Sequence, residues 1–413
     1  MNLDGQVSFA LALMFILLVP FAIAGLALIN TGLGRSRSAA HAMTTALCVV
    51  AVAILVYFIC GFAMQGSGNA QTFPPEPKTE PQLFLHGIRW GSLSSMSVLL
   101  WIEAAGLASL IPLGAASDRW RLGPACASTA LFSACTFPVF ARLSQGLWVA
   151  GGQIHDPGGS GIINVSGGLT ALAVAWLLGP RSGKYSANGM PAAIPAHNGV
   201  FVLFGCLLAW VGWIGLNAAG AIVNSALPSS EISARSVLAI LNTTVAAAAA
   251  ALTAAITTRI RFRRPDASLI ANGWMAGLVA SSAGCATLKP ATAILTGIIA
   301  GVLVVISVEW FELHLKVDDP CGSVSVHAVC GLWGLLAAGI FVGSAGQFTA
   351  QMVGIATLLG LIFPLTYGLN WLLNRFIWYR VSPDGERQGL DLHELGADAY
   401  PEFVVHSDEF LQR

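Results

Sequence analysis

The sequence predicts an all-α protein that crosses a membrane many times, and its composition supports this fold class. Of the 413 residues, 55% are hydrophobic and 10% are charged, and the mean hydropathy is +0.73. A soluble domain has roughly 25% charged residues, so this surface cannot face water on all sides. Forty-five glycines are typical of membrane helices that pack closely. Twenty basic residues balance twenty acidic ones, which argues against a nucleic-acid partner.

Eleven apolar runs are long enough to span a bilayer, which takes about 20 residues each. In chain order they are residues 7–31, 41–65, 86–115, 123–142, 160–180, 197–222, 233–259, 268–286, 291–311, 326–344 and 350–380. Neither a basic segment nor a small-residue cleavage site accompanies the first run, so we expect a retained helix there.

Two segments are predicted to lie outside the membrane. Residues 66–85 contain four prolines, which favours an external loop. Residues 381–413 carry ten charges in 33 positions and are predicted to form a cytoplasmic C-terminal tail or linker after a membrane domain of residues 1–380.

The loop arginines and lysines predict the orientation, because they concentrate on the cytoplasmic side of a membrane. Only five of the 20 basic residues fall on one side of the predicted spans, namely Lys78, Arg89, Arg142, Arg235 and Lys289. With an odd number of spans, the N-terminus is therefore predicted outside and the C-terminus in the cytoplasm. The eight cysteines contain no C-x-x-C pair, so we expect free thiols and no metal site.

The pattern D-P-x-G-S-x3-[N/H]-x3-G-L-x2-L occurs twice, at the start of the fifth and the tenth run. One copy begins at Asp156 and carries Asn164; the other begins at Asp319 and carries His327. The fifth run points inward and the tenth outward. The copies therefore predict an inverted repeat of five plus five helices, about 7–180 and 197–344, followed by helix 350–380. Such folds place their substrate path near the membrane midplane.

Each copy predicts a helix that begins at its Asp-Pro pair, since proline is tolerated in the first turn. For Asp156 and Asp319 we favour helix capping over a role in binding. Eight residues further on, about 12 Å along the axis, Asn164 and His327 would lie at similar depths. A polar side chain so deep usually faces the bundle interior or a pore. A packed structural histidine is the alternative for His327, but its symmetric partner favours a pore-lining role.

Several stretches together resemble one family. They are residues 20–25, Asp118-Arg119, Asp156 to Gly159, His197-Asn198 with Gly212-Trp213 and Asn217, Lys316 to Gly331, and Gly389-Leu390-Asp391. In these stretches the chain resembles the ammonium transporter (Amt/Mep/Rh) family over nearly its whole length, and Amt more than Rh. The resemblance implies eleven helices, a homotrimer with one pore per subunit, a plasma-membrane location, ammonium as the ligand, no cofactor and no enzymatic activity.

The resemblance also implies roles for pore residues. Trp148 matches an outer aromatic residue that recruits ammonium by cation–π attraction, Asp156 matches the helix-opening aspartate, and His327 matches the second of two adjacent histidines. Four positions depart from the family pattern. Asn164 replaces the first histidine, Ala104 and Leu216 replace two stacked phenylalanines, and Gly220 replaces a serine that helps to hold the cation.

These departures predict an altered pore. In this family the proton is thought to travel separately from ammonia, and imidazole rings suit that task. An amide donates and accepts hydrogen bonds but does not titrate. Asn164 is therefore expected to hydrogen-bond His327 without relaying a proton, and smaller gate residues leave a wider cavity. The alternative is that these are tolerated changes in a working channel.

Two functions remain open from the sequence. We favour an ammonium sensor or receptor with weak or no conduction; the alternative is a functional channel or transporter with a modified pore. The tail beyond Tyr400 predicts a signalling domain that follows Arg413. An ordinary terminus visited by a PII-type regulator is the alternative.

Overall fold

The computed structural model describes residues 3–66, 83–88, 90–91, 93–147, 153–223 and 229–400. These residues contain no β-strand and are mostly helical. Ten helices are long and apolar enough to cross a membrane, which confirms the predicted all-helical membrane fold. The predicted span at 268–286 is a shorter apolar helix, Ala267–Ser281. Most of the predicted loop at 66–85 and residues 401–413 of the tail lie outside the described residues.

The first half of the chain contains helices that correspond to the first five predicted spans. They are α1 (Leu3–Ile16), α2 (Val19–Leu33), α3 (Ala39–Val56), α4 (Phe62–Gln65), α5 (Leu93–Ala115), α6 (Leu122–Leu131), α7 (Phe137–Arg142) and α8 (Ser166–Leu178). The predicted first span is divided into α1 and α2, and α2 starts again with Pro20 in its first turn, where proline is tolerated. A π-helical turn at Ser160–Val165 leads into α8.

The second half contains the remaining spans and a short helix of the tail. They are α9 (Gly199–Val223), α10 (Ser229–Phe262), α11 (Ala267–Ser281), α12 (Pro290–Trp310), α13 (Cys330–Val342), α14 (Ala345–Thr357), α15 (Phe363–Phe376) and α16 (Pro383–Gln388). A π-helical turn at Val324–Val329 leads into α13, as its counterpart leads into α8. The helix α14–α15 begins five residues before the predicted residue 350 and ends at Phe376.

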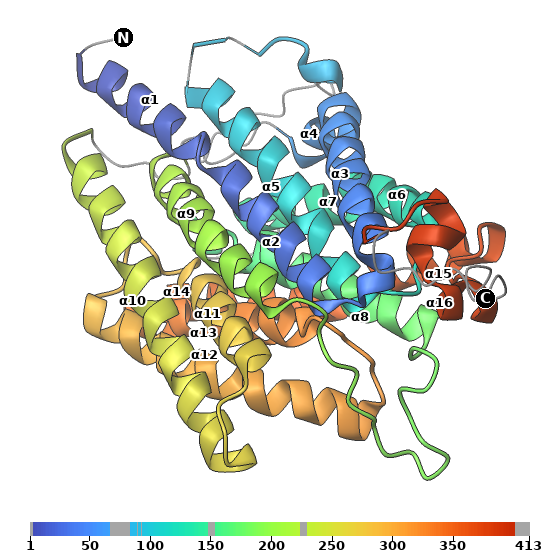
Figure 1. Cartoon of the computed structure of the whole chain (residues 1–413). Helices are drawn as coiled ribbons and strands as arrows, with labels where there is room; N and C mark the ends of the chain where they lie inside the picture. The colour runs from blue at the N-terminus through green and yellow to red at the C-terminus, as the bar shows by residue number, and fades with distance from the viewer. Residues whose placement is uncertain are drawn as a thin grey trace, which may run out of the picture.

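Helix α2, in the first span of the first half, and helix α9, the first of the second half, pack side by side (Figure 1). Glycines make this approach possible. A Cβ atom at Gly212 would lie 2.0 Å from the backbone nitrogen of Ala22, and one at Gly25 would lie 2.4 Å from that of Ala209. In a membrane the lipid tails are as apolar as the helices, so the hydrophobic effect does not drive helices together. Close backbone packing through small residues takes its place. The high glycine content therefore serves helix packing.

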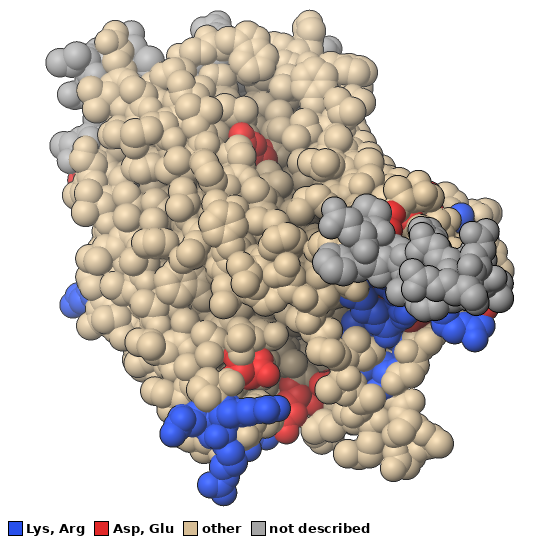
Figure 2. Space-filling model, in the orientation of Figure 1, with Lys and Arg blue, Asp and Glu red and all other residues tan. Residues whose placement is uncertain are grey.

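The surface has the division expected of a membrane protein. Figure 2 shows a face that is mostly uncharged in its upper and middle parts, apart from a small acidic patch, with basic side chains gathered at the lower left and on the right. Arg259, Arg261, Arg263 and Arg264, at or just after the end of α10, are all exposed. A wide and largely apolar surface with most of its charges towards the edges fits a protein surrounded by lipid.

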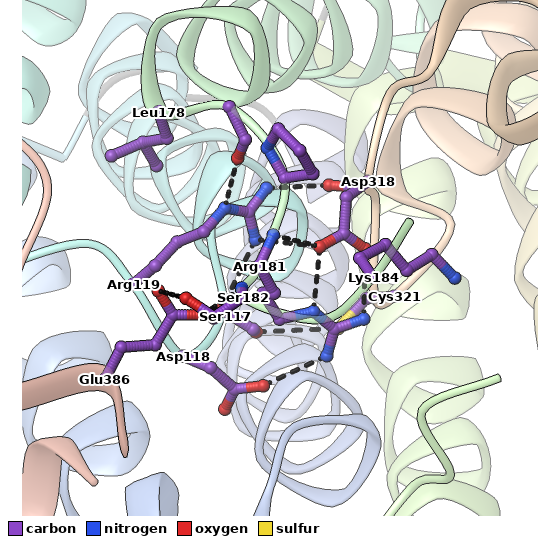
Figure 3. Close-up of polar contacts among 12 residues, drawn as sticks. Ser117, Asp118, Arg119, Leu178, Arg181, Ser182, Lys184, Asp318, Cys321 and Glu386 are labelled. Atoms are coloured by element: carbon purple, nitrogen blue, oxygen red, sulfur yellow. Dashed lines mark hydrogen bonds and ion pairs between the residues drawn. The ribbon is translucent and has the colours of Figure 1, made fainter. Parts of the chain in front are cut away.

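A buried ion network joins the ends of several helices (Figure 3). Arg181, which follows α8, donates from Nε and Nη2 to the two carboxylate oxygens of Asp318 over 2.9 and 3.0 Å. Its Nη1 donates to Asp118 Oδ2 over 3.0 Å. Arg119 is fully buried and donates to the backbone oxygens of Gly179 and Asp318.

The network determines the ionisation of Asp318. Burial alone would raise the pKa of this carboxyl group, but Arg119 and Arg181 outweigh burial and lower the pKa to about 2. Each charge is thus compensated by hydrogen-bonded partners, as buried charges must be. The sequence analysis used Arg181 as a marker of orientation and Arg119 as a marker of orientation and of the family; in the structure both belong to a cluster that holds the loops.

The C-terminal tail docks against the same end of the helix bundle, beside α3 and α6 (Figure 1). Asp391 is fully buried, and its carboxylate accepts from the backbone N–H groups of Ala40 and His41 at the start of α3. Glu394 accepts from the first N–H of α6, at Leu122, over 2.9 Å, and lies 2.8 Å from His41 Nε2. Two acidic side chains therefore hold the tail by capping two helix N-termini.

We expect Asp318→Asn to lower the free energy of unfolding by about 3 kcal/mol, because it leaves the buried guanidinium group of Arg119 without its counter-charge and leaves Arg181 with Asp118 alone. Denaturation in mixed detergent micelles at pH 7 measures this loss. Asp384→Asn is the control, since Asp384 pairs with Arg387 on the surface and such pairs contribute little. The contribution of Asp318 is complete above its ordinary pKa of about 3.9 and is lost as the pH falls towards 2. Equal effects of the two variants would contradict the network's role.

We expect Glu394→Gln to loosen the tail. Burial raises the pKa of Glu394, but hydrogen bonds from His41, Leu122 and Arg121 lower it to about 2, so the carboxylate is the form that docks. Hydrogen bonds to a charged group are worth about 1.5–3 kcal/mol. Amides 389–396 should therefore exchange with solvent about tenfold faster or more in the variant. Asp398→Asn is the control, because Asp398 accepts a local hydrogen bond from the N–H of Tyr400. Unchanged exchange in Glu394→Gln would argue against docking through this group.

Candidate functional site

The two segments that begin at the Asp-Pro motifs contact each other reciprocally. A Cβ atom at Gly168 would lie 2.4 Å from the backbone nitrogen of Ala328, and one at Gly331 would lie 2.7 Å from Val165 Cγ2. Gly168 and Gly331 occupy equal positions in the repeated pattern, and so do Val165 and Ala328. Equivalent residues of the two copies therefore make equivalent contacts, and the backbones of the two segments lie close together.

Asn164 and His327 meet at this crossing, and both are buried. His327 Nδ1 lies 2.8 Å from Asn164 Oδ1, while Asn164 Nδ2 donates to the carbonyl of Gly159 over 3.0 Å. Because the amide nitrogen is engaged by a carbonyl, the amide oxygen must face the ring and accept from it. The proton of a neutral ring therefore lies on Nδ1, and Nε2 carries the lone pair.

Asp156 and Asp319 cap the segments that follow them. Asp156 Oδ2 accepts from the N–H groups of Gly161 and Ile162 over 2.8 and 3.0 Å, and Asp319 Oδ2 accepts from Val324 N over 2.7 Å. The other oxygen, Oδ1, of each carboxylate is buried and has no hydrogen-bond partner among the described residues. These contacts match the capping role that the sequence analysis favoured.

The other predicted site residues lie in or beside the interior. Ala104 on α5 and Leu216 on α9 are buried in the main apolar core. Gly220 on α9 packs against the Asp156 loop so closely that a Cβ atom there would lie 1.9 Å from the carbonyl oxygen of Pro157. Glycine at this position is therefore a requirement of backbone packing. Trp148 lies outside the described residues.

The sequence analysis gave no role in the interior to Glu103, Asn30 or Asn217, although Asn217 was part of a family stretch. Glu103 lies within α5, and its Oε2 is buried without a partner in the described part of the chain. A carboxylate in the middle of an apolar run is itself a sign of such a site. Asn30 on α2 and Asn217 on α9 lie at related places in the two halves and bind Leu110 and Thr243 through their amide nitrogens.

No group of three or more His, Cys, Asp or Glu side chains is placed to hold a metal ion in the ranges that the structure describes. The eight cysteines are free thiols, four of them buried. Asn164 and His327 therefore offer hydrogen bonds and one titratable ring, and this chemistry suits a small hydrogen-bonding ligand.

Comparison with known proteins decides the family. A model described as the Ammonium Transporter Family matches residues 10–400. The chain belongs to this family. The ammonium transporter Amt2 of Archaeoglobus fulgidus is 33% identical over 441 residues, which cover 99% of this chain and 91% of that protein. Amt2 of Haloferax mediterranei is 29% identical, with 95% and 90% covered. These relatives are ammonium transporters and not enzymes.

Solved structures of ammonium transporter proteins share the fold. A structure named "Sensor Amt Protein" matches with a TM-score of 0.85 and 26% identity, covering 95% of this chain and 99% of that one. Mep2 of Candida albicans matches with a TM-score of 0.80 and 22% identity, covering 97% and 93%. The family resemblance inferred from the motifs is therefore confirmed.

We expect Gly220→Ser to displace the Asp156 loop and to destabilise the protein by about 1–3 kcal/mol, the usual effect of an overpacked core. Restoring the family's serine should therefore weaken ammonium binding instead of strengthening it. Denaturation and calorimetric titration with ammonium chloride measure the two effects. Gly368→Ser is the control, because a Cβ atom at Gly368 meets no atom within 4 Å. Tighter ammonium binding by Gly220→Ser would disprove the expectation.

Proposed function

We propose that this protein binds ammonium and reports its presence to the cytoplasm, with weak or no conduction. The observation that carries the proposal is the orientation of Asn164 against His327. Its amide nitrogen is held by Gly159 and its oxygen by the ring. The pair therefore has one fixed arrangement and a single group that can change its protonation state.

A fixed amide prevents proton transfer along this pair. A second ring could take a proton from His327 at one nitrogen and release one from the other, whereas an amide has no accessible protonation change near neutral pH. Ammonium that reaches the pair can donate to His327 Nε2, but its proton has no second ring to move to. Binding without efficient passage is the expected result.

The docked tail is an element that can transmit the signal that ammonium is bound. It is held by two helix caps at α3 and α6, and the hydroxyl group of Tyr400 lies 3.2 Å from His197 Nε2, just before α9. A movement of any of these helix ends alters a contact with the tail. We propose that the tail leads to a downstream signalling domain or is visited by a PII-type regulator. A homotrimer in the plasma membrane, as the family implies, is part of the proposal.

The similarity to the sensor structure supports this choice, because that match covers nearly the whole of both chains. The second candidate is a working ammonium transporter, and the 33% identity to an archaeal Amt2 favours it. Conduction measurements separate the two. If reconstituted wild-type protein carries ammonium current as readily as a twin-histidine relative, the sensor proposal is wrong.

We expect Asn164→His to raise ammonium-dependent current in proteoliposomes by about tenfold or more, on the scale that a positioned acid–base group contributes. Asn164→Gln is the matched control, because it keeps an amide and adds no titratable ring, and it should give no gain. Calorimetry should detect ammonium binding by the wild-type protein. No gain with histidine would place the block to conduction elsewhere and remove the argument from this pair.

A further inference from the structure

Glu103 is a carboxyl group in the middle of a membrane helix. Helix α5 consists of the 23 residues Leu93–Ala115, and Glu103 is halfway along it. At 1.5 Å per residue this helix is about 34 Å long, close to the roughly 30 Å of the hydrocarbon core of a bilayer. Glu103 therefore lies about 15 Å from either end of α5, near the membrane midplane.

Glu103 belongs to a narrow strip of α5 that the other helices leave partly uncovered. Between Val98 and Pro112 every residue of α5 is buried except Leu99, Ile102 and Glu103, which are partly exposed. Ile102 and Glu103 follow Leu99 by three and four residues, so the three share one side of the helix. At the depth of Glu103, one side of α5 therefore reaches the outer surface of the described part of the chain.

This strip lies between α2 and α3, which both pack against α5 (Figure 1). Gly106 is one turn from Glu103 on the same side of α5. A Cβ atom at Gly106 would lie 3.6 Å from Ile23 Cδ1 of α2 and 3.5 Å from Val50 Cγ1 of α3. Both neighbouring helices also expose large apolar side chains to the outside. They include Phe21 on α2 and Leu47 and Leu55 on α3. Such a surface is expected to face lipid tails.

The helices around Glu103 provide no cation to pair with it. The segments that pack against α5 are α1, α2, α3, α8, α9 and the π-helical turns 57–61, 132–136 and 160–165. Their sequences contain neither lysine nor arginine. Their titratable residues are Asp4, His41, Cys48, Tyr57, Cys60, Cys135 and Cys206.

The two strongest hydrogen-bonding groups in that set are engaged elsewhere. His41, at the start of α3, binds Glu394 of the tail, and the hydroxyl group of Tyr57 donates to Gln65. Glu103 forms no hydrogen bond or ion pair with another described residue, and its Oε2 is buried. Its carboxyl group is therefore isolated in an apolar environment.

Isolation of this kind favours the neutral acid. An ionised carboxylate that is buried without a partner is far more costly than a neutral polar group, and such a group is neutralised instead. For a carboxylate, neutralisation means that it binds a proton. Acidic groups within membrane helices commonly take part in proton transfer for this reason.

Glu103 lies on a different side of α5 from the segment that carries Asn164. That segment continues into α8, where a Cβ atom at Gly167 would lie 2.8 Å from Ala108 O and 2.6 Å from Ile111 Cδ1. At 3.6 residues per turn, these two contacts are roughly 80–140° around α5 from Glu103. The carboxyl group thus belongs to the outer side of the helix and not to the crossing of the two Asp-Pro segments.

We propose that Glu103 is a proton-binding site that opens to the lipid, separate from Asn164 and His327. Its carboxyl group is neutral at pH 7 and reacts with apolar carbodiimides dissolved in the bilayer. In that reaction the carboxyl proton moves to one carbodiimide nitrogen while the carboxyl oxygen bonds to the central carbon. The acyl group then moves from that oxygen to the other nitrogen, which gives a stable N-acylurea, and no atom leaves.

Labelling of the protein in liposomes at pH 7 with dicyclohexylcarbodiimide tests the site, with mass spectrometry of peptides as the measurement. We expect an adduct on Glu103 in the wild-type protein and its complete loss in Glu103→Gln. Glu231→Gln is the matched control and should keep the adduct, because Glu231 is an exposed residue in the first turn of α10 that pairs with Arg235. Absence of an adduct on Glu103 in the wild-type protein overturns the proposal.

Two further labelling conditions test where the site opens. A water-soluble carbodiimide should leave Glu103 unmodified while it labels Asp384, which is on the surface. Equal labelling of Glu103 by both reagents would mean access from water and would overturn the proposal. Ammonium chloride should not protect Glu103 from the apolar reagent; protection would place the carboxyl group in the ammonium path and contradict a separate site.

Infrared spectroscopy tests the bound proton without a variant. Modification of the wild-type protein at pH 7 should remove a carbonyl band of a neutral carboxylic acid from the spectrum. Loss of a carboxylate band instead would show that Glu103 is ionised and would overturn the proposal. The labelling of Glu103 and this band are measured without ammonium, so their outcome does not depend on the proposed function.

Discussion

The interior of this protein depends on the backbone contact between the two Asp-Pro segments. Gly168 against Ala328 and Gly331 against Val165 hold these segments closer than side chains would allow. Only at this distance can Asn164 reach His327. In lipid, where apolar surface gives little reason for helices to associate, such contact and the hydrogen bonds it permits are the main sources of affinity between helices. The same glycine contacts therefore pack the two segments together and bring Asn164 to His327.

At the end of the bundle, ion pairs between charged side chains hold the structure together, whereas close backbone packing does so in the interior. Burying Arg119, Arg181 and Asp318 is costly unless each charge is paired with good geometry, and the observed network meets this condition. The tail adds carboxylates that cap α3 and α6. One end of the molecule thus combines a rigid ionic cluster with a segment held by a few replaceable hydrogen bonds, and that combination suits regulated docking.

Much of the fold could be predicted from the sequence, because long apolar runs and many glycines are typical of helices that span a membrane. The repeat also located Asn164 and His327 correctly at one crossing, since identical offsets from Asp156 and Asp319 place them at equal depth. The break between α1 and α2, the short α11 and the ion network could not be predicted. Each depends on contacts between distant segments, such as Arg181 with Asp318, which no local pattern contains. Glu103 could have been recognised from the sequence, because it is a carboxylate within an apolar run.

The contact of Gly220 with the carbonyl of Pro157 has a consequence for the exchange of residues between members of the family. A serine at this position and the present position of the Asp156 loop exclude each other, so the two are epistatic. Changes at contacting positions are not additive, and a chain with serine at this position must hold the loop elsewhere. Transplanting single family residues into this scaffold therefore tests their compatibility with the loop first and their chemistry second.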